Sequence, residues 1–177
     1  MDRSKLEKQA RQLATVAHHE AGHAVAAFHC DIEIKSVTII PGSGTDGLHQ
    51  STPYFSDEEL ENITLPEMTG ELQLSIENYA FITLTGPWAQ KTYNPKGFRK
   101  AHLEGDWHSA LRLLSRVRED NEALELYVQL IDIDARNFVR DKFNWGVIRH
   151  LAGVMLNQPT MTGDEVHKAI MDSYKID

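Results

Sequence analysis

Two histidines four positions apart, with a glutamate directly after the first, are the residues of this sequence best suited to chemistry. His19, Glu20 and His23 form an H-E-x-x-H motif. Because residues four apart are neighbours on a helix surface, both imidazoles can reach one ion. The glutamate is turned about 100° from the first histidine, so it can touch a water molecule at the metal rather than the metal itself. The spacing therefore predicts a metal site with a general base, and His18, on another face, is expected to be a supporting or surface residue.

A metal site needs more than two ligands, and several side chains could supply the third. Zinc suits two histidines and a carboxylate because that set leaves the fourth position open. His29 has the spacing of a third histidine ligand, but the pattern that uses it needs a glycine where this chain has Ala26. Glu104, Asp106 and His108 stand close together further along the chain. Asp106 is expected to begin a helix, either as a ligand or as a simple N-cap, and spacing alone leaves these three open.

The elements that position these residues are expected to be mostly helical. Apolar residues recur in steps of three and four from residue 6 to residue 28, which predicts a helix that carries the motif. The β-branched run at 34–40, closed by Pro41, predicts a strand. Residues 41–70 are expected to form a loop with a second short strand near Leu48. Further helices are predicted at residues 71–91, 106–118, 121–143, 145–156 and 162–174, with Gly86 and Pro87 breaking or kinking the first of them.

Composition limits the functional classes. The chain has 177 residues, and its 18 Lys and Arg against 26 Asp and Glu give a formal net charge of −8. This acidic balance argues against a nucleic-acid partner. The single cysteine, Cys30, cannot form an intramolecular disulfide, and no apolar run approaches the length of a membrane span. We therefore expect one mostly α domain over residues 1–177, in a cytoplasmic protein with no membrane span.

Several segments together resemble the peptidase domain of the FtsH family of ATP-dependent zinc metalloproteases, peptidase family M41. They are VAHHEAGHAV at 16–25, VTIIPG at 37–42, Asp106 with Ala110, and TMTGDEV at 160–166, and the resemblance covers nearly the whole chain. It implies a helical fold with a small β element near the active site. It also implies that His19, His23 and Asp106 are the zinc ligands and that Glu20 is the catalytic base.

The sequence also departs from the family pattern. The family's Gly-x-x-Ala-Glu turn ends here in Gln90, and its small residues before the aspartate are replaced by His102 to Gly105. The loop after Pro41 lacks the usual basic residue, and the family's ATPase module and membrane anchor are not found in these 177 residues. We therefore expect cleavage of peptides or already unfolded proteins without ATP. The resemblance leaves open a homo-oligomer, since FtsH relatives form hexameric rings, and a separate ATPase or unfoldase partner.

Our hypothesis from the sequence is a zinc metalloendopeptidase in which Glu20 takes the proton from the attacking water. The strand residues Val37, Thr38, Ile39 and Ile40 are candidates for substrate binding, as an edge to which an extended peptide adds; the alternative is a small structural sheet. A catalytically degenerate domain that binds peptides or partners as an adaptor is the main rival, although the intact motif argues against it. A purely structural zinc site is less favoured because such sites are normally closed by four protein ligands.

Overall fold

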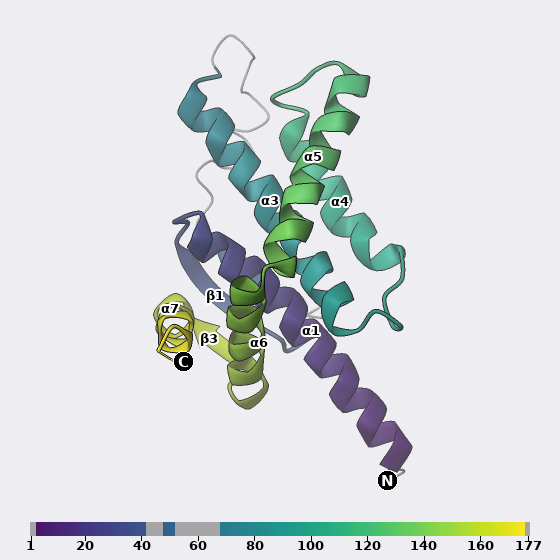
Figure 1. Ribbon diagram of the computed structural model, residues 1–177, viewed down its shortest axis with the longest axis vertical. Helices are drawn as coiled ribbons and strands as arrows, with labels where there is room; N and C mark the ends of the chain where they lie inside the picture. The colour runs from purple at the N-terminus through teal and green to yellow at the C-terminus, as the bar shows by residue number, and fades with distance from the viewer. Residues whose placement is uncertain (1–2, 42–47, 52–67, 176–177) are drawn as a thin grey trace.

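The computed structural model describes residues 3–41, 48–51 and 68–175, and this part of the chain is mostly helical, as predicted (Figure 1). The helices are α1 (Arg3–His29), α3 (Gly70–Tyr93), α4 (Ala101–Leu114), α5 (Asn121–Arg140), α6 (Lys142–Asn157) and α7 (Gly163–Ser173). The strands are β1 (Ile34–Thr38), β2 (Leu48–Ser51) and β3 (Thr160–Thr162). The short strand expected near Leu48 is confirmed as β2, while most of the expected loop 41–70 lies outside the described residues.

Helix α1 passes through the middle of the fold, with α3 and α6 packed against it (Figure 1). Its residues from Arg3 to Leu13 are exposed, whereas the stretch from Ala14 to Ala27, which carries the motif, is almost entirely buried. Small side chains let α3 come close: a Cβ added at Gly22 would lie 2.7 Å from the Cβ of Ala89. The helix of the motif is therefore fixed by close contact with α3.

Helix α3 continues without a break through Gly86 and Pro87, where the sequence predicted a break or a kink. It begins at Gly70, where the Thr69 hydroxyl accepts a hydrogen bond from the Leu72 N–H, and it continues past Pro87 to Tyr93. Gly86 and Gln90 are four residues apart, so they share one face of this helix. That face lies toward the motif of α1.

Strand β1 is the middle strand of a three-stranded sheet in the order β2-β1-β3, with both pairings antiparallel. Thr38 is paired with Leu48 on one side and with Thr160 on the other, and the Ile39 N–H donates to the Pro159 carbonyl at 2.9 Å. At Val37 and Thr38 the expected edge for a substrate is not open, because the backbone of β1 is paired on both sides there. Ile39 and Ile40 lie beyond the end of β1.

The side chains of the same segment agree with a structural role. Val37 and Ile39 are 0% exposed and belong to the core, while Ile40, beyond the end of the strand, is 56% exposed. A further strand could add only at the outer edges of β2 or β3. The alternative of a small structural sheet thus describes β1.

Helix α4 begins earlier than the sequence indicates. It starts at Ala101, with no side-chain cap at Lys100, and ends at Leu114. Asp106 therefore lies in the second turn of α4 rather than at its first position, and it is not an N-cap. Residues Ala101 to Gly105, which the sequence placed before the helix, are therefore part of it.

The core has two parts. One surrounds the second half of α1 and includes side chains of β1, α6 and α7; the other lies between α3, α4 and α5. Within the described ranges, we find no helix that is both long and apolar enough to cross a membrane.

Candidate metal centre

Three of the predicted side chains converge where α1 faces α3 and α4. The ε nitrogens of His19 and His23 are 2.9 Å apart, and a carboxylate oxygen of Asp106 lies 3.5 Å from the ε nitrogen of His19. One ligand atom from each of the three lies within 4.8 Å of the others. Among the described residues, these three side chains, which we call the metal group, form the cluster of His, Cys, Asp or Glu suited to hold a metal ion.

The ring of His23 is oriented by α3. Its δ nitrogen lies 2.8 Å from the Ile82 carbonyl oxygen. A carbonyl can only accept, so this nitrogen donates, and the neutral ring then keeps a lone pair on its ε nitrogen. The ring rests against Gly86, where an added Cβ would collide with it. Gly86 is thus required for His23 to present its ε nitrogen to the group.

The ring of His19 is oriented through a chain of side-chain hydrogen bonds. The backbone N–H of Arg99 donates to the δ nitrogen of His102, which marks that nitrogen as an acceptor. The amide nitrogen of Gln90 lies 3.1 Å from the same atom and therefore donates to it. The Gln90 oxygen then faces the δ nitrogen of His19 at 2.9 Å and accepts a hydrogen bond from its N–H. His19, like His23, is left with a lone pair on its ε nitrogen.

Burial is the largest influence on the pKa values of His19, Asp106 and Glu20. Burial, together with the neighbouring His23, lowers the pKa of His19 to about 3, so this ring is neutral at physiological pH. Burial raises the pKa of Asp106, with His23 opposing the shift. Burial also raises the pKa of Glu20 to about 7; His23 opposes this shift and Asp106 adds to it. Glu20 is only 6% exposed, and its carboxyl interacts electrostatically with His23 and Asp106 of the metal group.

The donor set fits a zinc ion. Two lone pairs that face each other at 2.9 Å beside a carboxylate repel one another, and a cation between them removes that repulsion. Zinc bonds of 2.0–2.1 Å at tetrahedral angles place two ligand nitrogens about 3.3 Å apart, close to the separation found here. Each imidazole also has the second hydrogen bond that metal-bound histidines normally make. The metal group can therefore hold a metal ion.

No protein-family model and no curated protein matches this chain. The resemblance to FtsH peptidase domains therefore rests on the sequence segments quoted above, and the chemistry of the site rests on its own geometry.

The other candidate ligands lie apart from the metal group. Glu104 and His108 are exposed on α4. His29 ends α1 with its ring centroid 5.0 Å from that of Phe138, so α1 continues straight where a third histidine ligand would need a turn. Of the three residues that spacing left open, the structure brings Asp106 to the two histidines.

His18 is buried and is not a surface residue. It is 7% exposed and stacks on Tyr93 with ring centroids 3.8 Å apart. Its δ nitrogen lies 2.7 Å from the Ala14 carbonyl oxygen. The sequence expectation for this residue is corrected accordingly: His18 packs α1 against the end of α3.

Sequence reasoning missed the roles of Gly86, Gln90 and His102. The first two stood out only as part of a turn that departs from the family pattern. The signal that could have found them is their four-residue spacing, which places both on one helix face if α3 continues through Pro87. His102 carried no comparable signal, because its contact with Gln90 depends on how α4 packs.

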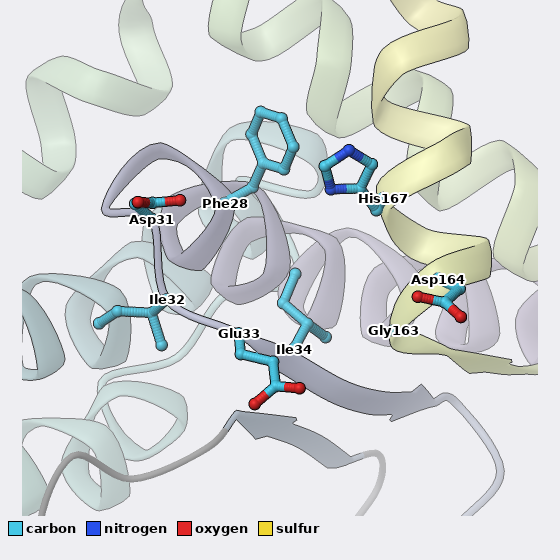
Figure 2. Close-up of a pocket in the computed structure, with 8 residues that line it drawn as sticks. All are labelled: Phe28, Asp31, Ile32, Glu33, Ile34, Gly163, Asp164 and His167. Carbon is cyan, nitrogen blue, oxygen red and sulfur yellow. The ribbon is translucent and has the colours of Figure 1, made fainter.

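A hollow of about 490 Å³ lies at the C-terminal end of α1, between the turn into β1 and the start of α7 (Figure 2). Its polar lining consists of Asp31, Glu33, Asp164 and His167, which we call the acidic hollow. Figure 2 shows these side chains spread around an opening rather than converging on one point. All four are exposed, so they do not repeat the arrangement of the metal group.

Proposed function

We propose that this chain is a zinc-dependent metallopeptidase, similar to the peptidase domains of the FtsH family, that hydrolyses peptide bonds in peptides or unfolded proteins. The observation that carries the proposal is the convergence of His19, His23 and Asp106 beside the buried carboxyl of Glu20. Three ligands leave one position of a tetrahedral ion open, as catalytic zinc sites do, whereas structural sites are closed by four.

Each residue has a defined part in this proposal. His19, His23 and Asp106 would hold the ion, and zinc, when bound, supplies the Lewis acidity that polarises a scissile carbonyl. Glu20, as a carboxylate, accepts the proton of the attacking water and later gives it to the leaving amine. Burial raises the pKa of Glu20 above its usual range, which makes it a stronger base than an exposed glutamate.

The arrangement around the ligands supports the same proposal. The Ile82 carbonyl and the Gln90 side-chain oxygen each accept a hydrogen bond from a δ nitrogen, so both imidazoles keep the orientation in which a metal can bind. An adaptor domain that only binds partners has no need of this arrangement or of a buried glutamate beside it. The peptidase is therefore favoured over the degenerate adaptor.

The test is Glu20→Gln, which keeps the size of the side chain and removes its ability to take a proton. Zinc content, measured by mass spectrometry, should stay at the wild-type ratio, while digestion of unfolded casein should fall by about 100-fold or more. Glu104→Gln is the matched control, since Glu104 is an exposed glutamate on α4. It should leave both zinc content and digestion unchanged.

Two other results would overturn the proposal in different ways. Casein digestion that survives in Glu20→Gln would remove Glu20 from the role of base. A wild-type protein that binds zinc and peptides without cleaving them would support the adaptor instead. Removal of the metal by a chelator should stop digestion, and added zinc should restore it.

A further inference from the structure

A second hollow lies at the connection between α3 and α4 and at the first half of α1. Figure 1 shows the course of this connection. Its volume is about 320 Å³, and its lining is Arg11, Tyr93, Asn94, Pro95 and Lys96. The wall is held in place, because the Asn94 side chain donates to the Thr15 hydroxyl at 3.2 Å. We call it the cationic hollow.

The charge of this region is opposite to that of the whole protein. The chain as a whole has a formal charge of −8, but residues 91–100 contain four basic side chains and no acidic one. Arg11 adds a further positive charge from α1. In the described part of the chain, neither Arg11 nor Lys96 forms a salt bridge. Two cations without acidic partners therefore line one hollow of an acidic protein.

The cationic hollow and the metal group both include side chains of α1. Tyr93 stacks on His18, which directly precedes the ligand His19. Arg11 precedes His19 by eight residues, which is roughly 12 Å along the helix axis. An extended peptide advances about 3.3 Å per residue, so about three or four residues of substrate would span this distance.

We propose that the cationic hollow is a substrate subsite that binds a carboxylate of the peptide, about three or four residues from the cleaved bond. This proposal rests on the peptidase function proposed above and names its substrate class: acidic segments of peptides or unfolded chains. An arginine guanidinium matches a carboxylate with two parallel hydrogen bonds, and the lysine adds a second positive charge. The carboxylate can come from an Asp or Glu side chain or from the end of a peptide.

The experiment compares internally quenched peptides that carry Glu or Gln at one position, moved stepwise away from the cleaved bond on either side. The peptides of this series all have an amidated C-terminus. Two further peptides end at the preferred distance from the cleaved bond, one in a free carboxylate and the other in an amide. Wild-type protein should show a kcat/KM about fivefold higher for Glu than for Gln at one position, and the ratio should fall toward one as salt is added. The free-carboxylate pair separates a side chain from a peptide end.

The decisive variant is the double substitution Arg11→Gln and Lys96→Gln, in which the Glu-to-Gln ratio should fall to about one. Arg140→Gln with Lys142→Gln is the matched control, because it removes one Arg and one Lys from exposed positions between α5 and α6. The control should keep the wild-type ratio. A ratio that survives in the Arg11 and Lys96 variant, or no preference at any position, overturns the subsite.

The remaining outcomes separate this proposal from others. If wild-type protein cleaves no peptide, the proposed function fails, and the subsite is then judged by fluorescence anisotropy. The Glu peptide should still bind about fivefold more tightly than the Gln peptide, and equal binding overturns the subsite as well. Sedimentation with phosphatidylserine vesicles that depends on Arg11 and Lys96, with no peptide preference, would assign the hollow to a membrane surface and overturn the proposal.

Discussion

The metal group and the acidic hollow both combine histidine with carboxylates close to α1, yet only the former is suited to bind a metal. In the metal group, side chains from α1 and α4 bring their ligand atoms within 4.8 Å of one another. In the acidic hollow, Asp31, Glu33, Asp164 and His167 are all exposed and surround an opening (Figure 2). The presence of histidine and carboxylates in one region is therefore not sufficient for a metal site.

What distinguishes the two regions is how each imidazole is held. The δ nitrogens of His19 and His23 are fixed by Gln90 and by the Ile82 carbonyl. Within the part of the chain that the structure describes, the ring of His167 meets the edge of Phe28, with ring centroids 5.1 Å apart. A fixed ring loses little freedom when it binds an ion, whereas an exposed ring must be ordered first.

The largest effect is expected from His23→Ala. Removing a ligand should weaken zinc binding by more than about 100-fold, because even loss of a residue that supports a ligand costs 10- to 100-fold. The measurement is a competition titration against a chromogenic chelator. His167→Ala, in the acidic hollow, should leave the zinc affinity unchanged. If both variants lost zinc equally, the contrast between the two regions would be wrong.

Gly86→Ala tests whether close packing of α3 holds His23 in place. The added methyl would collide with the His23 ring, so either the ring or α3 must move. We expect zinc affinity to fall by about 10- to 100-fold and unfolding free energy to fall by about 1–3 kcal/mol.

Gly153→Ala is the matched control for this substitution, since a Cβ at that position of α6 meets no atom within 4 Å. It should keep the zinc affinity and stabilise the protein by up to about 1 kcal/mol. Wild-type zinc affinity in Gly86→Ala would show that the ring does not depend on the glycine. Thermal unfolding together with the chelator titration measures both quantities.

The parts of the site that depend on local spacing could be predicted from the sequence, and the parts that depend on packing could not. His19, Glu20 and His23 share one helix, so their relation follows from helix geometry alone. Asp106 lies on another helix, and spacing alone did not distinguish it from Glu104 and His108 as the third ligand. The sequence predicted that a helix begins at Asp106, but the preceding Gly105 already lies inside α4.

The sheet, too, could be predicted only in part from local sequence. The β-branched run at 34–40 predicted a strand, and β1 is found at Ile34–Thr38. Its place in the middle could not be predicted, because β3 contains only Thr160, Met161 and Thr162 and becomes a strand by pairing with β1. Three residues carry too little pattern to indicate a strand.

Gln90→Leu should have a smaller effect than the glycine substitution. It removes the acceptor for the δ proton of His19 but leaves all three ligands, so zinc affinity should fall by about tenfold. Gln90→Glu keeps an acceptor and brings a negative charge close to the ion, so it should bind zinc at least as tightly as wild type. If both variants lost affinity equally, Gln90 would act by filling space rather than by orienting His19.

The smallest effect is expected at the acidic hollow. The Thr162 hydroxyl accepts the Glu165 N–H, and a Glu165 carboxylate oxygen accepts the Thr162 N–H at 2.8 Å; together they form the capping box that begins α7. Thr162→Ala should lower the unfolding free energy by about 1 kcal/mol, measured by urea denaturation. Thr162→Ser, which keeps the hydroxyl, should recover most of this loss.

Neither Thr162 variant should change zinc affinity, because the capping box lies at the acidic hollow and not among the groups that hold the ligands. A stability loss with full zinc binding would therefore show that α7 stabilises the fold independently of the metal group. If Thr162→Ala weakened zinc binding tenfold, the start of α7 and the metal group would be coupled. The metal group would then depend on the sheet and α7 as well as on α3 and α4.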